Sequence, residues 1–236
     1  MLLASLDVWH SRPIAPTRRL AVGDGFLPID PAPGPGGLLL GAIVARSSRS
    51  FDADIRSDMK ILMSQVERGL TIGQPRLRYR LQKDRIGLTR SRHRLLQGPD
   101  GLRFELETRK IAPAQSVLAA VYAVTELPAD KKHDVMAVLH KGLKWQGEDG
   151  PGLIDHLVGK DVAMRLRSGA FAVASDPMQW ALGVLELDLF DEPNPRQVQR
   201  QYRSLIRTAH PDHGGGAHHA ADRIEELGKA RDILLK

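Results

Sequence analysis

The sequence predicts an α+β protein in two parts: an N-terminal domain that mixes a sheet with helices, over residues 1–170, and an all-α C-terminal domain, over residues 177–236. Three observations support this prediction. Up to about residue 110, apolar residues often recur at every second position, which is typical of strands. From residue 113 onward they recur every three or four positions, which is typical of helices. The last sixty residues or so then form two amphipathic segments separated by a proline and three consecutive glycines.

The composition suits a globular chain with a packed core. The chain has 236 residues, of which 42% are hydrophobic, and a formal net charge of +6. It contains no cysteine, which excludes disulfides, cysteine-ligated metal sites and thiol catalysis. The longest apolar runs, residues 37–45 and 117–124, are far shorter than the roughly 20 residues of a membrane-spanning helix. The N-terminus also lacks the basic start of a signal peptide, so we expect a soluble, cytoplasmic protein without a membrane partner.

In the first seventy residues the pattern predicts three strands and one helix. Residues 2–8 and 17–22 could be short strands. Residues 37–45 are short, apolar and bounded by glycine and arginine, which favours a buried strand. Residues 51–68 repeat apolar positions every three or four, so we expect a helix there that ends at Gly69.

The segment 76–110 is strongly basic, with 11 Lys or Arg against 4 Asp or Glu. Arginine alternates with other residues along 76–81 and 90–94, which predicts strands with an apolar inner face and a cationic outer face. Residues 97–101 predict the turn of a hairpin. The outer face could bind nucleic acid or another anion, recognise an acidic client, anchor the chain to a complex, or be an ordinary solvated surface. Its candidate residues are Arg76, Arg78, Arg80, Arg90, Arg92 and Arg94.

Helical spacing then continues to the end of the N-terminal domain. We expect two packed helices over 114–127 and 130–143 and a further helix over 153–166. The domain boundary is expected within 167–176, followed by a helix that starts at Pro177. The buried stripe of that helix is predicted to consist of Met178, Ala181, Leu182, Leu185 and Leu189.

The most unusual feature is a helix predicted over residues 196–209. On an ideal helix, four of its arginines fall within an arc of roughly 60°, and apolar residues occupy the opposite side. Each pair of like charges costs a few tenths of a kcal/mol, and this segment contains no acidic residue. The pattern therefore predicts a docking surface for an acidic partner. The arginines are Arg196, Arg200, Arg203 and Arg207, and the apolar residues are Val198, Tyr202, Leu205 and Ala209.

The predicted helix ends at His210-Pro211-Asp212. Pro211 disfavours the helical conformation at His210, and the three glycines that follow do not sustain a helix. Asp212 is thereby held in a tight loop where its carboxylate can point outward, toward an arginine of a partner. A second amphipathic helix is expected over about residues 217–236.

Together, the basic helix, the His-Pro-Asp loop and the second helix resemble the J domain of the DnaJ family of co-chaperones, over residues 177–236. In that family, the loop and the basic helix dock on a DnaK-type chaperone and stimulate its ATP hydrolysis. The resemblance implies that the chain is not an enzyme, needs no cofactor and uses its N-terminal domain for targeting or for client binding. The corresponding residues here are His210, Pro211 and Asp212, with Arg196, Arg200, Arg203 and Arg207 as basic contacts.

The second helix departs from the family pattern. Ile224 stands where the family has an aromatic residue, which is a benign change. Arg231 stands where the family has a tyrosine, so it must extend to solvent or find a carboxylate. Gly228 weakens the second helix by about 1 kcal/mol relative to alanine. The family's fourth helix has no counterpart in the sequence.

The sequence suggests two other functions. Four histidines, at positions 210, 213, 218 and 219, lie close in sequence, but their spacing around the triple glycine is not that of a zinc site, so we expect no metal. In the alternative hypothesis, the protein binds nucleic acid or serves as a scaffold through the basic 76–110 sheet, and the J-like segment is only a structural module.

Overall fold

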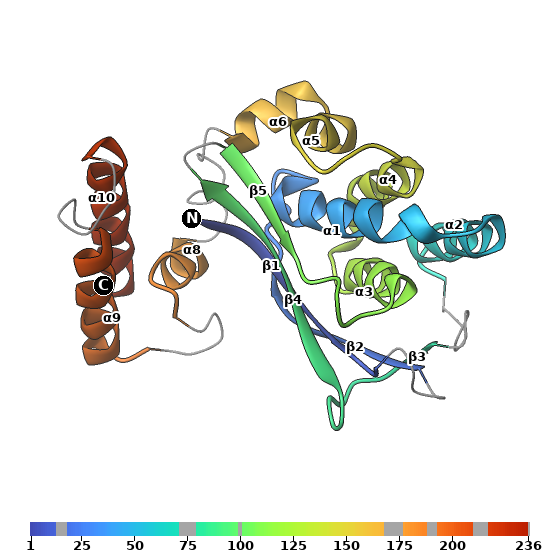
Figure 1. Ribbon diagram of the computed structural model, residues 1–236, viewed down its shortest axis with the longest axis horizontal. Helices are drawn as coiled ribbons and strands as arrows, with labels where there is room; N and C mark the ends of the chain where they lie inside the picture. The colour runs from blue at the N-terminus through green and yellow to red at the C-terminus, as the bar shows by residue number, and fades with distance from the viewer. Residues whose placement is uncertain are drawn as a thin grey trace.

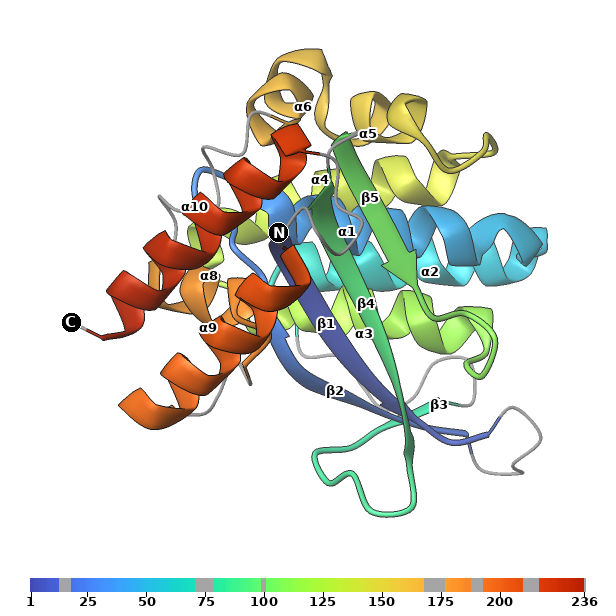
Figure 2. The same ribbon diagram turned by 60° about the vertical axis from the view of Figure 1, so that its left-hand side comes forward.

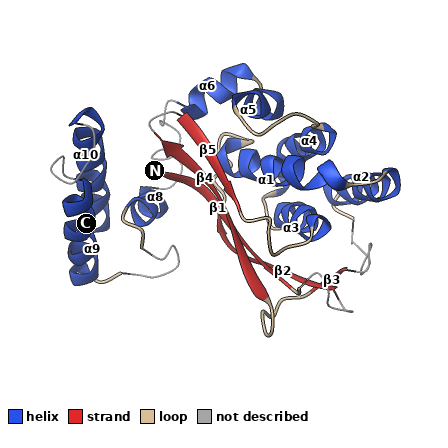
Figure 3. Cartoon of the chain, in the orientation of Figure 1, coloured by secondary structure: helices blue, strands red, loops and turns tan. Residues whose placement is uncertain are grey.

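The computed structural model describes residues 1–12, 18–70, 79–98, 101–167, 177–187, 193–209 and 217–235. The protein is α+β, as predicted. A twisted sheet carries helices α1 to α6 on one side, while α8, α9 and α10 lie on the other side of the sheet (Figures 1 and 3). None of the described helices combines the length and the apolar character that crossing a bilayer requires.

The sheet has five strands in the order β3-β2-β1-β4-β5. All neighbouring strands are antiparallel except β2 and β3. The predicted strands at residues 2–8 and 17–22 are confirmed and are longer than expected, and the β4–β5 pairing confirms the predicted hairpin. The strands are β1 (Leu2–His10), β2 (Arg18–Phe26), β3 (Tyr79–Leu81), β4 (Thr89–Gly98) and β5 (Gly101–Leu106).

Helix α1 (Gly34–Ser47) is the centre of the helical layer. The strand predicted for residues 37–45 is therefore wrong. Every residue of α1 except Arg46 is buried, because the helix packs against α3, α4 and the sheet at once. A helix that is covered on all sides has no polar face, so its sequence lacks the periodicity that separates a helix from a buried strand.

The other helices of this layer agree with the predicted spacing in all but one case. The long helix predicted for residues 153–166 is wrong, because Gly159 adopts a φ of 80° and divides it into two. The predicted helix over 51–68 and the predicted pair over 114–143 are confirmed. The helices are α2 (Ala53–Glu67), α3 (Pro113–Thr125), α4 (Ala129–Lys144), α5 (Pro151–Val158) and α6 (Lys160–Arg167).

Helix α8 (Pro177–Val184) joins the C-terminal helices to the sheet. It starts at Pro177 as predicted, and Ala181, Leu182 and Leu185 are buried. Met178, however, is 51% exposed, so its predicted burial is wrong, and Leu189 lies outside the described residues. The buried anchor is Trp180, whose Nε1–H points to the sulfur of Met1 at 2.8 Å.

Helices α9 (Pro195–Ala209) and α10 (Ala217–Leu234) lie side by side and run in opposite directions (Figure 2). Their apolar residues belong to the same continuous core as the sheet and the inner helices. Val198 of α9 and Leu227 and Ala230 of α10 are fully buried. The burial of these residues orients α9, so that its opposite side faces outward.

Candidate partner-binding surface on helix α9

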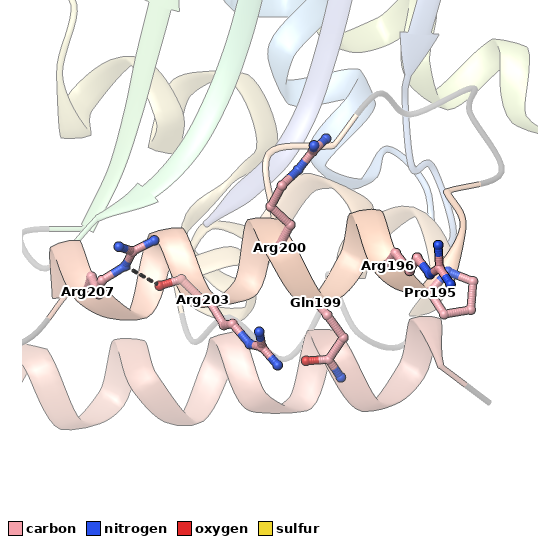
Figure 4. A pocket seen from close by; sticks show the side chains of 6 residues that line it. All are labelled: Pro195, Arg196, Gln199, Arg200, Arg203 and Arg207. Atoms are coloured by element: carbon pink, nitrogen blue, oxygen red, sulfur yellow. Dashed lines mark hydrogen bonds between the residues drawn. The ribbon is translucent and has the colours of Figure 1, made fainter.

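Four arginines cover the outward side of α9, and we call them the arginine face. All four are exposed. Together with Pro195 and Gln199 they line an open groove of about 550 Å³ (Figure 4). Their side chains spread along the helix, with Arg200 and Arg203 fanning to opposite sides. The arginine face consists of Arg196, Arg200, Arg203 and Arg207.

The arginine face is not neutralised by the part of the chain that the structure describes. No described carboxylate lies within ion-pair distance of any of its guanidinium groups. The polar contact recorded within the face is from Arg207 Nε to the backbone oxygen of Arg203, at 3.3 Å. Four positive charges therefore repel one another on a helix that is held in place by its buried side.

The predicted loop residues His210, Pro211 and Asp212 lie outside the described residues. They fall between the end of α9 at Ala209 and the start of α10 at Ala217. The positions 210 and 213 of the histidine cluster also lie in this interval.

Arg231 of α10 finds a carboxylate, as predicted, on the neighbouring residue of the same helix. Its Nε and one terminal nitrogen donate to Asp232 Oδ1 at 2.9 and 2.5 Å. Its guanidinium carbon also lies 4.8 Å from the centroid of the Tyr202 ring. The arginine thus covers a partly buried aromatic ring of α9 while its charge meets a carboxylate.

The second predicted surface is the outer face of the sheet. Unlike the arginine face, it has carboxylates among its arginines. Arg90, Arg92 and Arg94 do lie on the side of the sheet away from helices α1 to α6, but Asp7 on β1 lies among them. Arg92 binds both carboxylate oxygens of Asp7, at 2.7 and 2.9 Å, and Arg90 approaches Asp7 at 3.6 Å. The sequence argument missed Asp7, although its place in a strand predicted over residues 2–8 could have suggested a cross-strand partner.

The rest of the outer face repeats this arrangement. Arg94 and Arg103 share the carboxylate of Glu105, at 3.7 and 2.6 Å. Two carboxylates are thus each shared by two arginines, which leaves a much weaker excess of positive charge than four free arginines would. Arg80 is exposed, whereas Arg76 and Arg78 lie outside the described residues.

An aromatic ring that the sequence argument also missed stands on the same face. Trp9 of β1 lies against Gly23 of β2, where an added Cβ would come within 2.8 Å of the indole. The guanidinium carbons of Arg85 and Arg90 lie 5.5 and 6.0 Å from the Trp9 ring centroid. Because these arginines stack on the ring, it is not an open platform for stacking bases.

Two histidines are buried between the sheet and the helices. His10 and His93 have no solvent exposure. A ring nitrogen of His10 is 2.9 Å from Ser91 Oγ, whereas neither ring nitrogen of His93 has a hydrogen-bond partner. Burial lowers the pKa of His93 to about 4 and also lowers the pKa of His10. Although a histidine beside a serine can activate a nucleophile, this pair is sealed inside the core and has no access to a substrate.

Comparisons with known protein families, with curated proteins and with solved structures found no match. The description of the protein therefore rests on its fold and on the surface of α9. The chain is an α+β protein whose helix α9 presents a dense row of exposed arginines, with no carboxylate of the described residues beside them.

Proposed function

We propose that this protein is a J-domain co-chaperone. The arginine face and the adjoining His210-Pro211-Asp212 segment bind a DnaK-type chaperone and stimulate its ATP hydrolysis, while the N-terminal domain provides targeting or client binding. One observation carries the proposal: four exposed arginines, with no described carboxylate near them, lie on the helix that leads directly into this tripeptide.

The charge distribution supports a docking role. Arginines that repel one another on a free surface gain stability when an acidic surface covers them. Such complementarity mainly raises the rate of association and sets the orientation of the two proteins. The buried side of α9, anchored through Val198, keeps the backbone positions of the four arginines in a fixed row, so the helix itself does not have to be ordered on binding.

In this proposal the chemistry belongs to the partner. This chain supplies charge and shape to the chaperone, and no acid, base or nucleophile of its own takes part in the reaction.

The alternative, a nucleic-acid-binding or scaffold protein that uses the basic sheet, has weaker support. Arg90, Arg92 and Arg94 are paired with carboxylates of the same chain, and phosphates would have to compete with these pairs. If the alternative holds, neutralising Arg76, Arg78 and Arg80 weakens nucleic-acid binding and flattens its salt dependence.

The test compares two charge-matched triple variants in the ATPase assay of a purified DnaK-type chaperone. In the first, Arg200, Arg203 and Arg207 are each replaced by alanine. In the second, which is the control, the sheet arginines Arg90, Arg94 and Arg103 are replaced in the same way. We expect the first variant to lose about tenfold or more of the stimulation at low salt and the control to keep it. Equal losses in both would contradict the proposal.

A further inference from the structure

The strand β5 forms an open edge of the sheet. Among the described strands it is the last in the order, and its one partner there is β4. No described backbone group hydrogen-bonds to its other side, and no strand lies beyond it in Figure 2. An edge of this kind offers a row of N–H and C=O groups to which a further strand can pair.

A cleft of about 300 Å³ lies beside this edge. Strand β5 forms one wall, and the end of α1 and the start of α5 form the other. The apolar side chains that β5 turns toward the helices are only partly buried, although α1 and α6 both contact the strand. The cleft is lined by Leu102, Arg103, Phe104, Leu106, Arg46, Asp149, Gly150 and Ile154.

The rim of the cleft carries an excess of positive charge. Arg46 and Arg49 share the carboxylate of Asp149, at 2.5 and 2.7 Å. Arg103, whose side chain is 69% exposed, shares Glu105 with Arg94. Each carboxylate thus meets two guanidinium groups, so a further carboxylate near Arg46 or Arg103 is favourable.

We propose that β5 and this cleft bind an extended peptide segment of a partner protein by strand addition. The backbone of the peptide pairs with the open edge of β5. Its side chains alternate between the two faces of the extended sheet: apolar ones enter the cleft between Phe104 and Ile154, and a carboxylate lies near Arg46 or Arg103. This surface is separate from the arginine face, and the inference holds whether or not the proposed function does.

The test uses a fluorescein-labelled decapeptide that alternates leucine with threonine and carries one glutamate, and measures its binding to the full chain by fluorescence anisotropy. Two control peptides separate the contributions. One has N-methyl groups on alternate backbone amides, which removes strand pairing and keeps the side chains. The other carries lysine in place of the glutamate. We expect each change to weaken binding by about tenfold or more.

Two protein variants complete the test. Phe104→Glu places a charge in the cleft and should abolish binding. Ile86 does not line the cleft and is 81% exposed, so Ile86→Ser should leave binding intact. Should Phe104→Glu fail to fold, Arg46→Glu at the exposed rim takes its place. In addition, hydrogen exchange at the amides of β5 should slow when the peptide binds. Equal binding of the N-methylated peptide overturns the proposal, as does no binding at all. A dimer of this chain that Phe104→Glu dissociates also overturns it, since a second copy would then occupy the edge.

Discussion

The guanidinium carbon of Arg231 lies 4.8 Å from the centre of the Tyr202 ring, which ties α10 to α9. Because this contact lies on the side of α9 away from the arginine face, it helps to hold that face outward.

We predict that Arg231→Ala lowers the free energy of unfolding by about 0.5–1 kcal/mol, the usual value of an exposed cation–π contact. Urea unfolding measures this change. Lys60→Ala, at an exposed helical position of α2, serves as the control and should change the free energy by less than about 0.5 kcal/mol. An Arg231→Ala variant as stable as the parent would show that the contact contributes nothing.

Gly228 offers a stabilising substitution in α10. A Cβ added there meets no atom within 4 Å, so Gly228→Ala should raise the free energy of unfolding by about 0.5–1 kcal/mol through helix propensity. The matched control is Gly142→Ala in α4, where the new Cβ would lie 2.5 Å from the backbone oxygen of Gly41. That variant should be destabilised, because α1 and α4 must move apart. If both substitutions shifted the urea midpoint in the same direction, this account of the two glycines would be wrong.

Buried His93 makes stability depend on pH. Its pKa is lowered from 6.5 to about 4 by burial, so the unfolded chain binds a proton more readily than the folded one. The contribution of neutral His93 to the free energy of unfolding is fully present above pH 6.5. It declines as the pH falls toward 4, by about 3 kcal/mol in all. The lowered pKa of His10 acts in the same direction.

The measurement for this prediction is urea unfolding between pH 7.5 and 4.5. His93→Leu should make the pH dependence clearly shallower, because an apolar side chain replaces a buried ring without hydrogen-bond partners. Met164→Gln, which replaces a non-titrating side chain that is 68% exposed, should retain the full dependence. If the free energy of unfolding of His93→Leu depended on pH as steeply as that of the parent, groups other than His93 would be responsible for the dependence.

The elements that could be predicted from the sequence are those with one buried side. The strong two-sided pattern of residues 196–209 predicted α9 and its arginine face almost to the residue, and strict alternation predicted the β4–β5 hairpin. Residues 37–45 were misassigned because α1 is buried on all sides. The helix expected over 153–166 was misassigned because Gly159 takes a left-handed conformation, which residue spacing does not reveal.

The charge state of a surface was harder to predict than its position. Arginines 90, 92 and 94 were placed on the outer face of a strand, as the structure has them. The pairing of Arg90 and Arg92 with Asp7 depends on β1 lying beside β4, a contact between residues more than eighty positions apart. The anchoring role of Trp180 likewise depends on Met1 at the other end of the chain. Local pattern carries no information on such contacts.

The proposed function is tested most directly by single-turnover ATP hydrolysis of a DnaK-type chaperone, with the intact chain compared against its Asp212→Asn variant. This substitution removes one charge and keeps the size of the side chain, so folding should be unaffected, which circular dichroism checks. The account predicts that the intact chain accelerates hydrolysis and that Asp212→Asn abolishes the acceleration. Equal acceleration by both proteins, or none by the intact chain, would contradict it.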